Sequence, residues 1–194
     1  MLTQRFDDAL AYAHALHRLQ TRKGQNATPY IAHLLGVSSL VLEHGGDEDE
    51  AIGGLLHDAV EDQGGRETGE EIARRFGAKV ADIVWGCTDA EVVPKPAWEE
   101  RKQRYLNHLG RASGSVLLVS SADKLYNART ILSDYLEVGD AVFERFTASK
   151  DRTLWYYRGL VSAYTSSSNL TARPGTVRLV RDLDAVVSDL EATR

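Results

Sequence analysis

The sequence has very few of the residues that build disulfide scaffolds or thiolate metal sites, since only one cysteine occurs among its 194 residues. That residue, Cys87, cannot pair within the chain, and this excludes a secreted disulfide framework and a cysteine-based zinc site. No stretch approaches the ~20 apolar residues that a membrane span needs, and charged residues interrupt the N-terminal segment where a signal peptide would be apolar. These absences predict a cytoplasmic protein without a membrane partner.

An excess of positive charge is also missing. The chain has 23 Lys and Arg residues against 28 Asp and Glu residues, which gives a formal net charge of −5. Binding to nucleic acid regardless of sequence depends on a basic surface, so we expect no nucleic-acid partner. Only four prolines occur, and the length suits one domain with a sizeable core.

Apolar side chains recur every three or four residues along most of the chain, and no alternating strand pattern competes with them. The sequence therefore predicts an all-α fold. The expected helices lie at about 3–18, 29–44, 47–63, 68–76, 80–87, 98–109, 113–132, 143–164 and 179–190. Residues 1–164 are expected to form the domain, and 165–194 a serine-rich linker with an amphipathic helix that packs on the domain or on a partner.

Titratable side chains are concentrated in one expected helix, within residues 55–62. His57 and Asp58 are adjacent, and Glu61 and Asp62 follow one helical turn later. Charged groups placed directly after a buried apolar pair are unfavourable unless they meet a cation, and a metal ion is the simplest such cation. The segment therefore indicates a metal site.

Two residues elsewhere complete a candidate ligand set. His33 lies on the preceding expected helix, and Asp123 follows an apolar run, with Asn127 one turn beyond it. Two imidazoles and two carboxylates without a thiolate suit Mn²⁺, Fe²⁺ or Zn²⁺ with an open position for water, rather than a closed structural zinc site. Each of these residues alone is more often an ordinary surface or core residue, and the combination favours catalysis.

Taken together, the motifs resemble the HD superfamily of metal-dependent phosphohydrolases. Within it they resemble the hydrolase domain of RelA/SpoT proteins, in particular the stand-alone small alarmone hydrolases and the metazoan SpoT homologues. The resemblance spans about residues 6–157 and rests on the segments 11–17, 21–24, 29–33, 55–62, 100–102 and 122–130. It implies a compact HD-domain helical bundle of about ten helices and one Mn²⁺ ion, with Fe²⁺ or Zn²⁺ as alternatives.

The resemblance also implies a reaction. In this family the 3′-pyrophosphate is removed from guanosine tetraphosphate and pentaphosphate, (p)ppGpp, to give GDP or GTP and pyrophosphate. The metal ligands implied by the resemblance are His33, His57, Asp58 and Asp123. Because a metal ion activates bound water and a nearby carboxylate can accept its proton, this chemistry agrees with the residue types present.

Further residues match family positions around the substrate. Glu61 and Asp62 match the acidic pair that positions or deprotonates the attacking water, and Asn127 matches a residue near the ribose and the 3′ phosphate. Of the family's basic pair, Arg22 would stack on the guanine ring and Lys23 would face phosphate. We also expect Lys95 and Lys102, near the site in the family, to bind phosphate.

The chain departs from the family pattern at three positions. Leu34 stands where proline usually follows the histidine, Gln63 where threonine usually follows the acidic pair, and Ser120 where a lysine often occurs. These departures leave open the preference among phosphorylated nucleotides, including NADPH with its 2′-phosphate.

The same residues are compatible with two alternative functions, and the sequence also bears on synthetase activity. The alternatives to a (p)ppGpp hydrolase are an HD-domain nucleotide phosphatase of other specificity and a non-catalytic alarmone-binding module. The stretch after Tyr164 is too short for a synthetase domain, so we expect degradation of the alarmone without synthesis. The oligomeric state cannot be inferred from the sequence.

Overall fold

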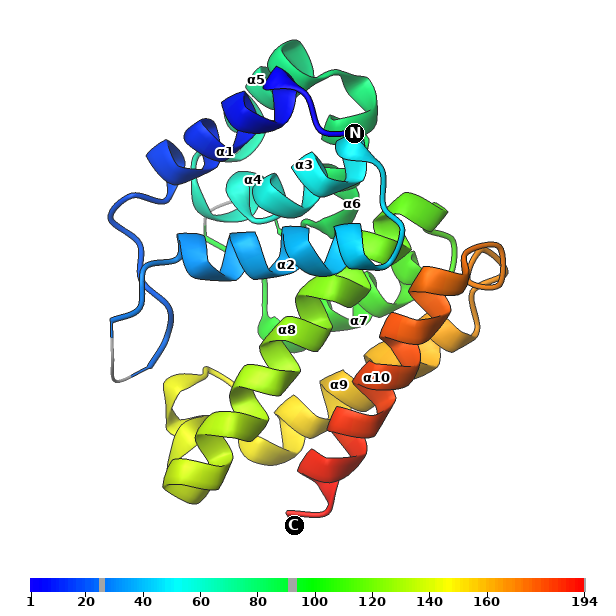
Figure 1. Ribbon diagram of the computed structural model, residues 1–194. Coiled ribbons are helices and arrows are strands. Elements are labelled where there is room, and N and C mark those ends of the chain that lie inside the picture. Colours follow the sequence, from blue (N-terminus) through cyan, green and yellow to red (C-terminus); the bar gives the residue numbers. More distant parts are fainter. Residues whose placement is uncertain (25–26, 91–93, 194) are drawn as a thin grey trace.

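The computed structural model describes residues 1–24, 27–90 and 94–193, and it confirms the all-α prediction (Figure 1). Within this part the only extended pairing is an isolated bridge between Thr21 and Pro29. These described ranges contain ten α-helices and one 3₁₀ helix: α1 (Gln4–Leu16), α2 (Ile31–Glu43), α3 (Glu48–Leu56), α4 (Ala59–Asp62), α5 (Gly65–Phe76), α6 (Ala78–Cys87), α7 (Trp98–Leu109), α8 (Gly114–Val138), η1 (Gly139–Arg145), α9 (Lys150–Thr165) and α10 (Pro174–Glu191).

Helix α8 is the longest element and crosses the middle of the molecule, with α2, α6 and α10 packed against it (Figure 1). Its apolar residues Leu117 and Leu125 join Leu160 of α9 and Leu183 of α10 in one hydrophobic cluster. A second cluster forms among α1, α2, α3, α5 and α6. The two clusters meet where α2 and α3 contact α8, and this seam is where the predicted ligands lie.

The start of α3 shows the capping box that the sequence predicts. The Asp47 carboxylate accepts a hydrogen bond from the Glu50 backbone N–H at 3.0 Å, and Glu50 Oε2 accepts one from the Asp47 N–H at 2.9 Å. Glu50 Oε1 also accepts from Ser115 Oγ at 2.6 Å, and Arg173 forms a bidentate ion pair with the same carboxylate. One buried side chain therefore ties together the starts of α3, α8 and α10.

The expected start of the second helix at Thr28 and Pro29 is wrong. Helix α2 begins at Ile31, because backbone hydrogen bonds from Arg22 to Thr28 (2.8 Å) and from Tyr30 to Gln20 (2.9 Å) hold the preceding residues against the loop. These bonds join segments that are separated in sequence, and a local capping pattern does not reveal them.

Three other expected helix boundaries also differ. The helix expected at 47–63 is divided at His57 and Asp58 into α3 and α4. Thr68 lies inside α5 rather than at its start, and its hydroxyl donates to the Gln63 carbonyl at 2.6 Å. The helix expected at 143–164 is instead two elements. The 3₁₀ helix η1 ends at Arg145, and α9 begins at Lys150 with Ser149 as its N-cap.

The C-terminal helix α10 packs against α8 and α9. Its buried face consists of residues such as Leu179, Leu183 and Leu190, which follow the amphipathic spacing that the sequence shows. The division of the chain at residue 164 stays a prediction. Among the described residues, no helix combines the length and the apolar character that crossing a membrane requires.

Candidate functional site

The four predicted metal ligands come together at the seam between the two hydrophobic clusters. His33 comes from α2, His57 and Asp58 from the junction of α3 and α4, and Asp123 from α8. His33 Nε2 lies 3.3 Å from His57 Nε2, 3.3 Å from Asp123 Oδ1 and 3.5 Å from Asp58 Oδ2. His57 Nε2 lies 2.9 Å from Asp58 Oδ2 and 3.6 Å from Asp123 Oδ1. Side chains from three helical segments thus direct their nitrogen and oxygen atoms toward the same position.

The chemistry of this donor set fits a divalent cation. His57 Nδ1 lies 2.8 Å from the Gly54 carbonyl oxygen, which can only accept, so Nδ1 carries the proton and Nε2 is free to act as a ligand. Both imidazoles are almost fully buried, at 0% exposure for His33 and 2% for His57. Two imidazole nitrogens and two carboxylate oxygens packed this closely, with both rings buried, favour a positive charge between them.

The electrostatics of the metal-free cluster point the same way. Burial opposes a charge on His57, but Asp58 and Asp123 raise its pKa well above the ordinary value. Burial likewise opposes the charge of Asp58, while His57 and the histidine hydrogen bonds hold the Asp58 pKa well below its usual value. The extra proton on the His57 imidazole therefore supplies the positive charge that a metal cation would supply. The proton and the metal exclude each other, because an imidazole binds a metal only as the neutral ring.

Hydrogen bonds from neighbouring residues orient the two carboxylates. Tyr30 Oη donates to Asp58 Oδ2 at 2.6 Å, and Asn127 Nδ2 donates to Asp123 Oδ1 at 2.5 Å. Lys124 Nζ contacts the second oxygen, Asp123 Oδ2, at 2.5 Å. Neither Tyr30 nor Lys124 is a predicted site residue, although both lie in segments that carry the family resemblance.

A cavity of about 550 Å³ opens onto this cluster. The predicted site residues that line it are Asp58, Asp123, Glu61, Asp62, Asn127, Arg22, Lys23, Lys95 and Lys102. His33 and His57 are not part of the lining, because they lie buried behind the carboxylates. The structure therefore brings the predicted ligands, acidic pair and basic residues to one pocket.

The acidic pair lies on α4, one turn beyond Asp58. Glu61 Oε1 contacts Lys95 Nζ at 2.7 Å, and Asp62 Oδ2 accepts a hydrogen bond from Gln20 Nε2 at 2.8 Å. Partial burial, followed by the negative charge of Asp89, raises the pKa of Glu61, and partial burial followed by Asp58 raises that of Asp62. A raised pKa makes each carboxylate a better acceptor for a proton from water near neutral pH.

The predicted basic residues occupy two sides of the cavity. Arg22 Nη2 donates to Asn127 Oδ1 at 2.9 Å, and Lys23 Nζ lies 5.9 Å from the centroid of the Phe146 ring. Lys102 is ion-paired with Asp89 and lies 4.8 Å from the Tyr156 ring centroid. Burial and the charge of Lys124 lower the pKa of Lys102, while Asp89 opposes this shift.

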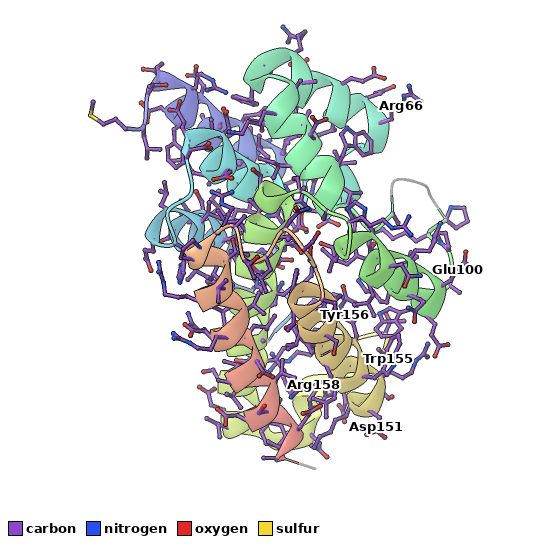
Figure 2. The ribbon with its side chains drawn as sticks, turned by 90° about the vertical axis from the view of Figure 1, so that its right-hand side faces the viewer. Arg66, Glu100, Asp151, Trp155, Tyr156 and Arg158 are labelled. Atoms are coloured by element: carbon purple, nitrogen blue, oxygen red, sulfur yellow. The ribbon has the colours of Figure 1, made fainter. Side chains whose placement is uncertain are left out.

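The cavity wall contains further residues besides the predicted site residues. Arg101, a basic residue in a segment that carries the family resemblance, pairs through Nη1 with Asp89 at 2.5 Å, and the ring of Trp98 lies 5.9 Å from that of Tyr156. Figure 2 shows Tyr156 and Trp155 on α9, the helix that packs against α7. Tyr156 is buried in the pocket wall, whereas Trp155 is exposed. No spacing pattern in the sequence distinguishes such wall residues from ordinary core residues.

Comparisons with known proteins agree with the site. Residues 9–151 match the profile of the HD domain family. The chain is 41% identical over 126 residues to the guanosine-3′,5′-bis(diphosphate) 3′-pyrophosphohydrolase MESH1 of Xenopus tropicalis, a match that covers 64% of this chain and 68% of the relative. It is 37% identical over 126 residues to the Homo sapiens protein of the same name, with 64% and 68% covered.

A solved structure is similar over nearly the whole chain. It is described as "A metazoan ortholog of SpoT hydrolyzes ppGpp and plays a role in starvation responses", and it matches with a TM-score of 0.74 and 25% identity over 97% of both chains. The resemblance inferred from the sequence is thereby confirmed. Because the family match spans every candidate ligand and the acidic pair, the chain belongs to the HD domain family, alongside the MESH1 pyrophosphohydrolases.

Proposed function

We propose that this protein is a guanosine-3′,5′-bis(diphosphate) 3′-pyrophosphohydrolase, which converts (p)ppGpp and water to GDP or GTP and pyrophosphate. The observation that carries the proposal is the position of Glu61 and Asp62, one turn from Asp58 in a pocket lined by basic side chains. A bare metal cluster would suit many phosphohydrolases, whereas an acidic pair and several cations suit a substrate with two diphosphate groups. The names of the MESH1 relatives support the same reaction.

As an HD domain protein with a buried cluster of histidine and aspartate, the chain is suited to a divalent metal ion. We propose that His33, His57, Asp58 and Asp123 hold one Mn²⁺ ion, with Fe²⁺ or Zn²⁺ as alternatives. When bound, the ion would supply Lewis-acid stabilisation of the charge that develops on the phosphoryl group.

The side chains of the pocket then have separate tasks. Glu61 and Asp62 orient the attacking water and accept its proton as the new phosphorus–oxygen bond forms. The bond from phosphorus to the ribose 3′ oxygen breaks, and this oxygen takes a proton from solvent to become the 3′ hydroxyl of GDP or GTP. Arg22 stacks on the guanine ring, while Lys23 and Lys102 neutralise phosphate groups and hold the nucleotide in line. Lys95 forms an ion pair with Glu61, and its ammonium group can bind a phosphate of the substrate in place of this carboxylate. A cytoplasmic location stays a prediction from the sequence.

The proposal is tested by incubating metal-free protein with ppGpp, with and without Mn²⁺, and separating the products by anion-exchange chromatography. We expect GDP and pyrophosphate in a ratio of about one to one, and only when the metal is present. Release of single phosphates, or preferential turnover of NADPH, would instead identify a phosphatase of other specificity. Tight binding of ppGpp without any turnover would identify a non-catalytic binding module.

A further inference from the structure

His17 is a buried side chain that none of the site roles above uses. It follows α1, is 2% exposed, and its ring stacks on Tyr30 with centroids 5.2 Å apart and planes inclined by 17°. Its Nδ1 lies 2.7 Å from Oε1 of Gln20. Polar atoms are seldom buried without a purpose, so the partner of this imidazole is informative.

Gln20 connects His17 to the acidic pair. Its Nε2 donates to Asp62 Oδ2 at 2.8 Å, while its Oε1 accepts from Gln63 Nε2 at 2.6 Å and faces His17 Nδ1. Asp62 can only accept while it is ionised, so the amide nitrogen must face it and the amide oxygen must face the other two partners. Three contacts thus fix one rotamer and one orientation of the Gln20 amide.

The same contacts fix the tautomer of His17. Because Gln20 Oε1 can only accept, the proton of the neutral ring must lie on Nδ1. His17 Nε2 has no hydrogen-bond partner among the described residues, which suits a nitrogen without a proton better than a buried N–H donor. Burial also lowers the pKa of His17, which keeps the ring neutral at pH 7.

Asp62 needs such support because its own helix orients it weakly. It is the last residue of α4, which has four residues and is followed directly by a turn at Gln63 and Gly64. A cation, Lys95 Nζ, lies 3.9 Å from its Oδ1. A hydrogen bond to Oδ2 therefore leaves Oδ1 as the oxygen that faces the cation and the cavity.

We propose that Gln20, held in place by His17 and Gln63, is a positioning residue that orients the Asp62 carboxylate for hydrolysis. This inference rests on the proposed function. Gln63, which stands where the family usually has threonine, gains a role here, since its amide supports the bridge that reaches Asp62. The network acts through Asp62, and His17 also stacks on Tyr30, which donates a hydrogen bond to Asp58.

Kinetics of Gln20→Leu with ppGpp as substrate test the role. A misplaced carboxylate slows the chemical step, so we expect kcat to fall about 10- to 100-fold while KM changes by less than about threefold and Mn²⁺ stoichiometry is unchanged. In an Asp62→Asn background, Gln20→Leu should cause no further loss, because the residue through which it acts is already altered. The matched control is Gln103→Leu, which removes a surface bond to Asn107 and should leave kcat unchanged.

Three kinetic results would overturn the inference. They are a kcat of Gln20→Leu within about twofold of wild type, a raised KM at unchanged kcat, and an equal loss in the Asp62→Asn background. The second would make Gln20, which lines the cavity, a substrate-binding residue instead.

A spectroscopic test is independent of substrate and metal. Nitrogen-15 NMR of the wild-type protein with its histidines labelled should show His17 as the neutral Nδ1–H tautomer, and Gln20→Leu should change that signal. An Nε2–H tautomer, or a signal that Gln20→Leu leaves unchanged, would refute the network. If wild-type protein fails to hydrolyse ppGpp, the proposed function falls, while the NMR result still decides whether the bridge exists.

Discussion

Among single residues, Asp123 uses its two carboxylate oxygens differently. Oδ1 faces the imidazole of His33, and Oδ2 pairs with Lys124, whose side chain is 16% exposed. Asp123→Ala therefore removes a proposed ligand and also leaves a largely buried cation without this carboxylate. We expect loss of Mn²⁺ binding by calorimetry, and a fall of about 3 kcal/mol in the unfolding free energy of the metal-free protein in urea.

The control for this prediction is Asp189→Ala, an exposed position on α10, which should leave both measurements unchanged. Adding Lys124→Met to Asp123→Ala should recover part of the stability but none of the metal binding. Stoichiometric Mn²⁺ binding by Asp123→Ala would remove Asp123 from the ligand set.

Glu61 offers a test that separates chemistry from metal binding. It lies outside the ligand cluster and is held by Lys95, so Glu61→Gln should keep Mn²⁺ affinity. If Glu61 accepts the proton of the attacking water, kcat should fall about 10²- to 10⁴-fold, as measured by GDP formation. Glu67→Gln, an exposed change on α5, serves as the control. Full activity of Glu61→Gln would show that another group is the base.

Between helices, the close approach of α2 and α8 sets the spacing of the ligands. Gly36 lies one turn after His33, and a Cβ added there would lie 2.1 Å from the Tyr126 ring, one turn after Asp123. Gly36→Ala should push the two helices apart, lower the unfolding free energy by about 1–3 kcal/mol and weaken Mn²⁺ binding. Gly110→Ala is the control, because its added Cβ would meet an ordinary contact at 3.7 Å. Unchanged metal affinity in Gly36→Ala would contradict this account.

The starts of α3, α8 and α10 share the Glu50 carboxylate, and this gives a pH dependence. Burial opposes the charge, but Arg173, Ser115 and the backbone of Asp47 hold the Glu50 pKa below its ordinary value of 4.5. The folded state therefore binds fewer protons than the unfolded state. The stabilisation is complete above the unfolded pKa and is lost as the pH falls through the folded pKa.

Glu50→Gln should accordingly lower the unfolding free energy by about 2 kcal/mol at neutral pH, because it removes hydrogen bonds to a charged group. The difference from wild type should shrink in urea titrations carried out at acidic pH. Glu43→Gln, on the exposed end of α2, should cost little at either pH. An equal difference at both pH values would mean that the charge of Glu50 is unimportant.

Helix boundaries show how far local sequence patterns can predict the fold. The capping box of Asp47 with Glu50, and a cap at either Ser113 or Ser115, can be predicted because each pattern is complete within a few residues, and the structure has Ser113 as the cap. The start of α2 was not, because a bridge between Thr21 and Pro29 decides it. The break at His57 was not predicted either, since no glycine or proline marks it.

The same distinction applies to the site. His33, His57, Asp58 and Asp123 could be grouped from motif spacing and family resemblance, and in the structure both carboxylates lie 3.3 to 3.5 Å from His33 Nε2. The bridge through Gln20 was not foreseeable, because it depends on side-chain directions in three segments. Backbone spacing predicts which residues gather, whereas hydrogen-bond partners follow only from packing.

Across the whole molecule, the net charge of −5 would repel a polyanionic nucleotide, so the cations of the pocket must attract it locally. Such attraction is screened by salt. We expect KM for ppGpp to rise several-fold as ionic strength increases from about 0.05 to 0.5 M, with kcat nearly unchanged. The control is sucrose at the same osmolality as the salt, which changes water activity without changing ionic strength. A KM that does not depend on salt would argue against electrostatic capture by Arg22, Lys23, Lys95 and Lys102.

The position of the cluster at the seam between two hydrophobic cores has a consequence for biosynthesis. His33, His57 and Asp58 all precede α6, whereas Asp123 belongs to α8 and is translated much later. If these four residues are the ligands, as proposed, a nascent chain exposes three of them before the fourth exists and cannot complete the set until the central helix has left the ribosome. Binding of the ion would then require that the two halves of the chain have already packed together.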